Sequence, residues 1–308
     1  MNELLKTVFF VDVLKNLDTK NLLRLKEINK GFNNYVKNNL KYLKIDCSSS
    51  NITDHQLKAL AGVHTIHLYF CKNITDVGLS YLKGVQNIDL TCTEVTDEGL
   101  KYLKGVSIII LTFCKNITDK GLSYMEGVHT INLEDCYRIT DKGLSYLQGV
   151  QNIDLSGSPE IPIVEEPSTI LQITDKGLSY LKGVKTINLS FCDSITDEGL
   201  FHIKGVQTIS LRGCTKITDK GLKYLKGVQN INLDLCTNIT KKGLIYLKGV
   251  KKISIFHVRD FKEDLSLLNG ANRVNTYWNY NNPITMEMNK IKFYCWKTHD
   301  SVKKIINS

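Results

Sequence analysis

The stretch ITDKGLSYLKGV, from Ile173 to Val184, recurs with small variations along most of the chain. Successive copies start 22 residues apart, except for one step of 21 residues and one of 34. A fixed internal period of this length is typical of a solenoid, in which each unit stacks only on its neighbours. The nine copies begin at Ile52, Ile74, Val95, Ile117, Ile139, Ile173, Ile195, Ile217 and Ile239.

Each copy predicts a short helix followed by a short strand. In the copy that begins at Ile217, Thr218 and Asp219 can accept hydrogen bonds from the N–H groups of a first helical turn. Two leucines three residues apart face inward, and Gly227 allows the left-handed backbone that ends a helix. The stretch Val228–Cys236 alternates between apolar and polar residues, which indicates a half-buried strand. We therefore expect parallel strands on the concave face of the solenoid and short helices on its convex face.

The T-D-x-G start of each copy favours a structural interpretation over a catalytic one. Its aspartate is expected to begin a helix rather than to serve in an acid–base pair. Its glycine falls inside the short helix, where close packing of adjacent copies is the simplest explanation. Examples of this glycine are Gly78, Gly99 and Gly121.

A cysteine follows most of the predicted strands. The repeat places these cysteines in one buried ladder, where a thiol acts as a small apolar group and a weak donor to a turn. The chain has no C-x-x-C pair, so the usual zinc spacing is absent. The cysteine count of nine is odd and no secretory signal is recognisable, which favours a cytoplasmic or nuclear location over secretion. The ladder comprises Cys71, Cys92, Cys114, Cys136, Cys192, Cys214 and Cys236, and Cys47 marks an incomplete leading copy.

Composition argues against several classes of function. The chain has 308 residues and a net charge of +9, but its lysines recur at fixed places in each copy. That pattern indicates a solvated helix face rather than a specific nucleic-acid site, since no aromatic stacking platform accompanies the lysines. No apolar run is long enough to span a membrane. The chain also lacks G-x-x-x-x-G-K-[ST], G-x-S-x-G and H-E-x-x-H motifs, so we expect a non-catalytic protein with no metal and no cofactor.

The strand segment V-x-x-I-x-L-x-x-C fits the leucine-rich-repeat consensus. Residues 43–258 resemble the cysteine-containing leucine-rich repeats of F-box/LRR proteins, which implies an α/β leucine-rich-repeat solenoid. We expect residues 259–308 to form a C-terminal cap, in which Lys290–Trp296 can add a strand.

Residues 1–42 do not follow the repeat and predict helices with two apolar stripes. One interpretation is a cap that shields the first copy from water. The run Leu17–Leu25, followed by Ile28, Lys30 and Phe32, also resembles an F-box core, although Lys6 stands where the family has a proline after Leu5. The resemblance implies that residues 5–36 dock a Skp1-type adaptor through Leu5, Phe9, Leu14, Leu17, Leu22, Leu23, Leu25, Ile28 and Phe32.

By this resemblance, the chain is the substrate receptor of a Skp1–cullin–F-box (SCF) ubiquitin ligase and binds a protein substrate on the concave face. Ubiquitin transfer would be carried out by partner subunits of the cullin–RING ligase. The alternative is a leucine-rich-repeat module that only binds protein, with the N-terminus as a cap. Neither interpretation identifies the substrate.

Outward strand positions supply the candidate substrate-binding residues. Exposed aromatic residues flanked by polar ones are typical of interface anchors. The alternative for the phenylalanines is that they fold back and pack over the next turn. The candidates are Tyr69, Phe70, Phe113, Glu134, Phe191, Arg212 and Asp234.

An insertion at residues 159–172 accounts for the long step between two copies. Its prolines disfavour both helix and sheet, so we expect a projecting loop. Such a loop is either a recognition element or a tolerated surface insertion. It contains Pro159, Glu160, Pro162, Glu165, Glu166 and Pro167.

Overall fold

The computed structural model describes the repeats and two further strands, and it divides into two compact units at Val184 and Lys185. The F-box-like segment, residues 159–171 of the insertion and most of the C-terminal cap lie outside the described residues. The described residues are Tyr42, 44–158, 172–256, Ala271, Arg273–Asn275 and Lys292–Tyr294.

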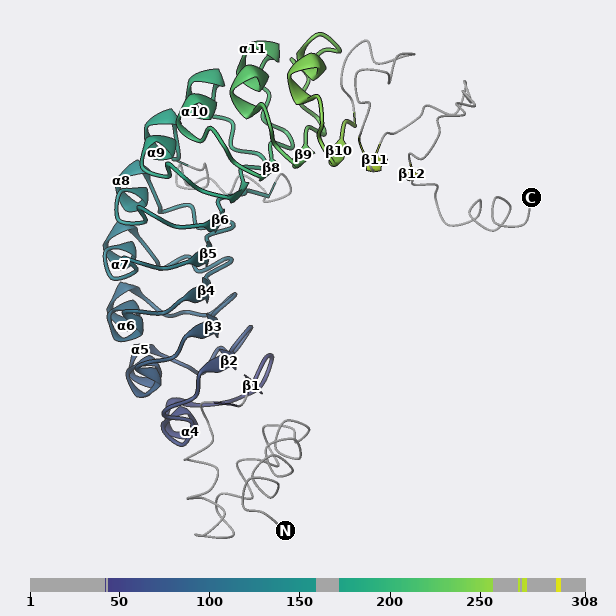
Figure 1. Cartoon of the computed structure of the whole chain (residues 1–308). Helices are drawn as coiled ribbons and strands as arrows, with labels where there is room; N and C mark the ends of the chain where they lie inside the picture. Colours follow the sequence, from purple (N-terminus) through teal and green to yellow (C-terminus); the bar gives the residue numbers. More distant parts are fainter. Residues whose placement is uncertain are drawn as a thin grey trace, which may run out of the picture. The chain divides into compact units, whose positions relative to one another are not determined.

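In the first unit, parallel strands alternate with short helices along the chain. The strands lie on one side of the unit and the helices on the other (Figure 1). Each strand pairs with the next in sequence order, so that Ile88 lies opposite Ile109. The 3-10 helices η2 (Ser80–Leu82) and η3 (Lys101–Leu103) extend two of the helices. The strands are β1 (Lys44–Asp46), β2 (Thr65–His67), β3 (Asn87–Asp89), β4 (Ile108–Ile110), β5 (Thr130–Asn132) and β6 (Asn152–Asp154). The helices are α4 (Asp54–Lys58), α5 (Asp76–Leu79), α6 (Asp97–Leu100), α7 (Asp119–Leu122), α8 (Asp141–Leu144) and α9 (Asp175–Ser179).

The second unit repeats this arrangement, again with each strand parallel to the next. The expectation of an added strand within Lys290–Trp296 is confirmed by β12, whereas the repeat pattern did not predict β11. The strands are β7 (Thr186–Asn188), β8 (Thr208–Ser210), β9 (Asn230–Asn232), β10 (Lys252–Ser254), β11 (Arg273–Asn275) and β12 (Lys292–Tyr294). The helices are α10 (Asp197–His202), α11 (Asp219–Leu222), η5 (Lys223–Leu225) and η6 (Gly243–Leu247).

The apolar repeat positions form the core, as the pattern predicts. The central residue of each strand from β1 to β10 is buried, and so are Leu222 and Leu225 of the helical segment. Gly227 has a φ of 89° and lies between that segment and β9, which confirms the predicted left-handed turn. The short strand and helix of each copy are thus buried between their neighbours.

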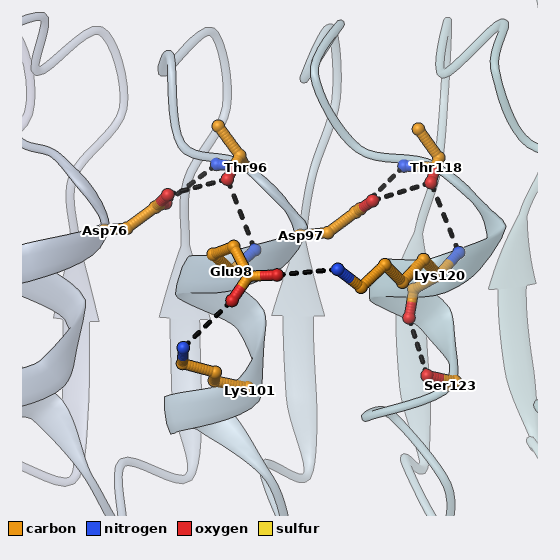
Figure 2. Close-up of polar contacts among 8 residues, drawn as sticks. All are labelled: Asp76, Thr96, Asp97, Glu98, Lys101, Thr118, Lys120 and Ser123. Atoms are coloured by element: carbon orange, nitrogen blue, oxygen red, sulfur yellow. Dashed lines mark hydrogen bonds and ion pairs between the residues drawn. The ribbon is translucent and has the colours of Figure 1, made fainter.

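A threonine–aspartate contact links successive copies and corrects the predicted role of the aspartate (Figure 2). Thr118 caps its own helix, since its Oγ1 accepts a hydrogen bond from the Lys120 N–H at 3.2 Å. Asp97 of the preceding copy does not cap its own helix. Its carboxylate accepts hydrogen bonds from the Thr118 N–H at 2.8 Å and from the Thr118 hydroxyl at 2.6 Å. We call this contact the Asp–Thr staple.

The same staple recurs in both units. It also joins the copies on either side of the insertion, through Asp141 and Thr174. The insertion therefore leaves the stacking contact unchanged. The other stapled pairs are Asp54–Thr75, Asp76–Thr96 and Asp119–Thr140 in the first unit, and Asp197–Thr218 and Asp219–Thr240 in the second.

The glycine of T-D-x-G is required by the staple. A Cβ atom added to Gly121 would overlap the Asp97 carboxylate and come within 3.0 Å of Leu100 Cδ1. Gly78 and Gly99 face the staple aspartates of their own preceding copies in the same way. Close packing of adjacent copies, which the sequence predicts as the reason for this glycine, is confirmed.

The buried ladder is confirmed, with one correction to its membership. Cys114 Sγ donates to the Leu90 carbonyl of the preceding copy at 3.1 Å, and Cys136 Sγ donates to the Leu111 carbonyl at 3.1 Å. The ladder position between Cys71 and Cys114 is occupied by Thr93 and not by Cys92. The 21-residue step lacks one residue, and that residue is missing after the ladder position, so the register places Thr93 there. None of the cysteines among the described residues is disulfide-bonded.

We expect the change Thr118→Val to lower the free energy of unfolding by roughly 1–2 kcal/mol, because it removes both the cap and the donor to Asp97. The measurement is urea unfolding followed by circular dichroism. Ser123→Ala is the matched control, since the exposed Ser123 hydroxyl donates only to the Lys120 carbonyl within its own copy. Equal losses in the two variants would contradict the staple's role.

Candidate functional site on the strand face

The strand face of each unit contains three rows of side chains. The first row is the last residue of each strand, such as His67 of β2. The second row lies two residues later, as Tyr69 does, and the third row follows directly, as Phe70 does. The backbone continues the sheet pairing through the third row, where the Phe70 N–H donates to the Thr91 carbonyl at 2.9 Å. The sheet therefore fixes the spacing of all three rows.

Most first-row side chains fold the chain rather than face a ligand. Asp89 Oδ1 accepts hydrogen bonds from the Thr91 N–H at 2.9 Å and from its hydroxyl at 2.6 Å. Asn132 Oδ1 accepts in the same way from the Glu134 N–H at 2.8 Å. These short side-chain turns bend the chain where a strand ends in Asp or Asn. In the second row, Thr91, Ser156 and Ser190 are buried, whereas Tyr69 and Arg212 are exposed.

The second row contains four of the predicted residues. Tyr69 is 39% exposed, Arg212 is exposed, and Glu134 and Asp234 are half-buried. Asp234 Oδ1 accepts from the Ser254 hydroxyl at 2.7 Å and from the Phe256 N–H at 2.7 Å. Part of its hydrogen-bonding capacity thus holds the next copy in place.

Glu134 is the centre of a negative region on the first unit. Burial, followed by the nearby charges of Asp154 and Asp135, raises the pKa of the Glu134 carboxyl above its ordinary value. A positive group placed beside a carboxylate in such surroundings stabilises its charged form. The region therefore favours a ligand with a basic side chain.

Asp135 is a third-row residue whose side chain is buried. Its Oδ1 accepts from the Tyr137 hydroxyl at 2.5 Å and from the Ser158 N–H at 2.8 Å. Its Oδ2 has no hydrogen-bond partner among the described residues. Burial, followed by the hydrogen bond to Asp135, raises the pKa of the Tyr137 hydroxyl above its ordinary range. Because Ser158 directly precedes the insertion, Asp135 fixes the last described residue before it.

In most copies the third-row residue has a left-handed backbone, which bulky residues rarely adopt. Phe70, Phe113 and Phe191 have φ values of 57°, 58° and 61°. The sheet bonds of their N–H groups and the following turn impose this conformation. Gly213 occupies the same position in its copy with a φ of 74°. Three phenylalanines therefore lie where glycine would be the less strained choice.

The three phenylalanines differ in their surroundings. Phe70 is 41% exposed, and its ring meets Tyr69 edge to face with 4.5 Å between centroids. Phe191 is half-buried, lies against Gly213 and has the Arg212 guanidinium 5.5 Å from its ring centroid. Phe113 is half-buried. The structure thus pairs Tyr69 with Phe70 and Arg212 with Phe191.

Within the described residues, no group of three or more His, Cys, Asp and Glu side chains is placed to hold a metal ion. No helix in that part of the chain is long and apolar enough to cross a membrane. The nine adaptor-binding candidates, from Leu5 to Phe32, lie outside the described residues.

The two interpretations of the phenylalanines predict different stabilities for glycine variants. Phe70→Gly should leave the free energy of unfolding unchanged or raise it by up to about 1 kcal/mol, because glycine relieves the left-handed strain. Phe191→Gly should be less stable than Phe70→Gly by about 1 kcal/mol or more, because its ring packs against the next copy. Urea unfolding of both variants checks this. If Phe70→Gly lowers the free energy of unfolding as much as Phe191→Gly does, Phe70 is a packing residue.

Comparison with known proteins supports the fold. A family model described as a leucine-rich repeat matches residues 85–104 and 184–203. No curated protein matches the sequence. A chain of the yeast Rad7 and Elc1 complex is similar with a TM-score of 0.50 and 15% identity, over 94% of this chain and 91% of that one.

Two further solved structures are similar at lower TM-scores. Internalin C2 from Listeria monocytogenes has a TM-score of 0.41 and 16% identity, over 78% of this chain and 92% of its own. The TLR13–ssRNA13 complex has a TM-score of 0.45 and 11% identity, over 82% of this chain and 43% of that one. The repeats, the parallel strands and the Rad7 similarity together identify the described residues as a leucine-rich-repeat solenoid.

Proposed function

We propose that this chain is a non-catalytic subunit that brings a protein substrate to a Skp1–cullin–RING ubiquitin ligase. The observation that carries the proposal is the combination of an F-box-like run before the repeats with exposed aromatic and charged side chains on the strand face, namely Tyr69, Phe70 and Arg212. The Rad7 and Elc1 structure is consistent with it, since there a protein of this fold occurs in a complex.

The strand face of the first unit supports a proposal for the chemistry of the substrate. Tyr69 and Phe70 form an exposed aromatic pair, which suits an apolar side chain of the partner. Glu134 lies in a negative region, which suits a lysine or arginine. The substrate segment we propose therefore carries both apolar and basic side chains. In the second unit, Arg212, Phe191 and Asp234 provide further contacts.

The N-terminal segment would connect this binding face to the ligase. Leu5, Phe9, Leu14, Leu17, Leu22, Leu23, Leu25, Ile28 and Phe32 would dock the Skp1-type adaptor, as the F-box resemblance implies. Holding the substrate near a ubiquitin-charged enzyme on another subunit raises the effective concentration of its lysines. This chain would then contribute position and specificity, and its partners would contribute the chemistry.

The adaptor step can be tested by pull-down of a purified Skp1-type adaptor with the full chain and with the double variant Leu22→Asp, Leu25→Asp. We expect the full chain to retain the adaptor and the double variant to lose it, because two charges would enter an apolar docking stripe. Lys26→Asp is the control, since Lys26 is a polar residue between the stripe positions Leu25 and Ile28. Circular dichroism establishes that the repeats of each variant remain folded.

Absence of binding by the full chain to several adaptors would overturn the ligase proposal. It would leave the alternative, a leucine-rich-repeat module that binds protein and whose N-terminus is only a cap. The replacement of the F-box proline by Lys6 is the feature of this chain that favours the alternative.

A further inference from the structure

The helix face of the second unit departs from the repeat at two exposed positions. Phe201 is 49% exposed and Ile245 is 59% exposed. Both occupy the position that directly follows the leucine of the G-L pair. In four copies of the first unit this position is serine, namely Ser80, Ser123, Ser145 and Ser179. An apolar side chain with this exposure is therefore specific to these copies and is not a requirement of the fold.

Phe201 belongs to a cluster of aromatic rings and lysines. Its ring meets that of Tyr224 edge to face with 5.5 Å between centroids. Lys204 Nζ lies 3.7 Å from the Phe201 centroid and 5.1 Å from that of Tyr224, and Lys223 Nζ lies 4.7 Å from the Tyr224 centroid. The ring faces thus hold the ammonium groups in place at the surface.

Ile245 and Tyr246 continue this cluster on the next helical segment. Both lie in η6, which packs against η5, where Lys223 and Tyr224 lie. Tyr246 is 41% exposed. We call the six residues Phe201, Lys204, Lys223, Tyr224, Ile245 and Tyr246 the lysine–aromatic patch.

The charge around this patch is strongly positive. Residues 185–256 contain eleven lysines and Arg212 against Asp193, Asp197, Glu198, Asp219 and Asp234, a net charge of +7. Three of these five carboxylates accept hydrogen bonds inside the fold, Asp197 from Thr218, Asp219 from Thr240 and Asp234 from Ser254. In the first unit, by contrast, Glu98 pairs with Lys101 at 2.9 Å and with Lys120 at 2.7 Å. The described residues of the second unit contain no lysine–carboxylate ion pair.

We propose that the lysine–aromatic patch is a second interaction surface, separate from the strand face, that binds a protein segment with acidic and apolar side chains. Carboxylates of the segment complement the unpaired lysines, and its apolar side chains cover Phe201 and Ile245. A nucleic acid fits less well, because bases stack on open ring faces and here lysine ammonium groups cover those of Phe201 and Tyr224.

The spacing of the patch limits the form of the segment. Phe201 and Ile245 are two copies apart, and neighbouring helices pack about 10 Å apart, so roughly 20 Å separates them. An extended chain covers that distance with about six residues. The ligand is therefore an extended segment with two apolar residues about six positions apart and carboxylates between them, where Lys223 lies.

The proposal can be tested by selecting a displayed library of random 16-residue peptides on the full chain. Counter-selection uses the double variant Phe201→Ser, Ile245→Ser, which installs the residue found in four other copies and should fold normally. We expect enriched peptides with carboxylates between two spaced apolar residues. The affinity of a synthetic copy should fall about tenfold or more in the double variant and with rising salt. Val77→Ser is the control, since Val77 is 58% exposed on a helix of the first unit.

Three results would overturn the proposal. One is no enrichment over the counter-selection, and another is enrichment of peptides without carboxylates. The third comes from a competition arm with random-sequence single-stranded RNA. If this RNA displaces the selected peptide and binds Ile245→Ser as tightly as the unmodified chain, the patch is a nucleic-acid surface. Loss of adaptor binding in the pull-down would leave this proposal unaffected, because the two tests use different parts of the chain.

Discussion

The hydrogen bonds from the Thr of one copy to the Asp carboxylate of the copy before it are the contact on which the rest of this structure depends. Asp97 accepts from both the backbone and the hydroxyl of Thr118, and Thr118 in turn caps its own helix. One threonine thus satisfies a helix start and joins two copies. The carboxylate can approach this closely only because Gly121 has no side chain. Three residues of the T-D-x-G motif therefore act together, across two copies.

This contact sets the spacing of everything on the opposite side of each unit. Because each helix is held to the next, each strand pairs with the next in a constant register, and the sheet bonding continues into the left-handed third row. The phenylalanines of that row and the second-row residues Tyr69 and Glu134 are consequently positioned by backbone hydrogen bonds. A binding face built this way loses little conformational freedom when a partner docks. The same regularity makes the departures at Phe201 and Ile245 on the helix face informative.

Much of this could be predicted from the sequence, because a repeated pattern reports the same local physics many times. The alternation within each strand, the left-handed Gly227 and the close packing at Gly121 all followed from residue type and position. The role of Asp97 did not, because an aspartate after threonine fits a helix start equally well within its own copy. The prediction that Cys92 belongs to the ladder was wrong. It followed residue type and did not allow for the shift in register that the 21-residue step causes.

The candidate site was less predictable than the fold. The sequence indicates which positions face outward, but not that Asp89 and Asn132 are used in turns while Tyr69 is presented to solvent. The buried Asp135 gave no signal beyond its charge, because its burial depends on Tyr137 and Ser158. The pairing of lysines with aromatic rings on the second unit likewise depends on contacts between copies. Such contacts join residues about one period apart, which a pattern within one copy does not reveal.

The most direct test of the staple is a double-mutant cycle of Asp97→Ala and Gly121→Ala, with the free energy of unfolding measured in urea. We predict that Gly121→Ala costs roughly 2–3 kcal/mol in the unmodified chain, because its methyl group overlaps the Asp97 carboxylate. In the Asp97→Ala background the same change should cost about 1 kcal/mol or less, since only the contact with Leu100 remains. Additive losses, equal within about 0.5 kcal/mol in the two backgrounds, would contradict the account.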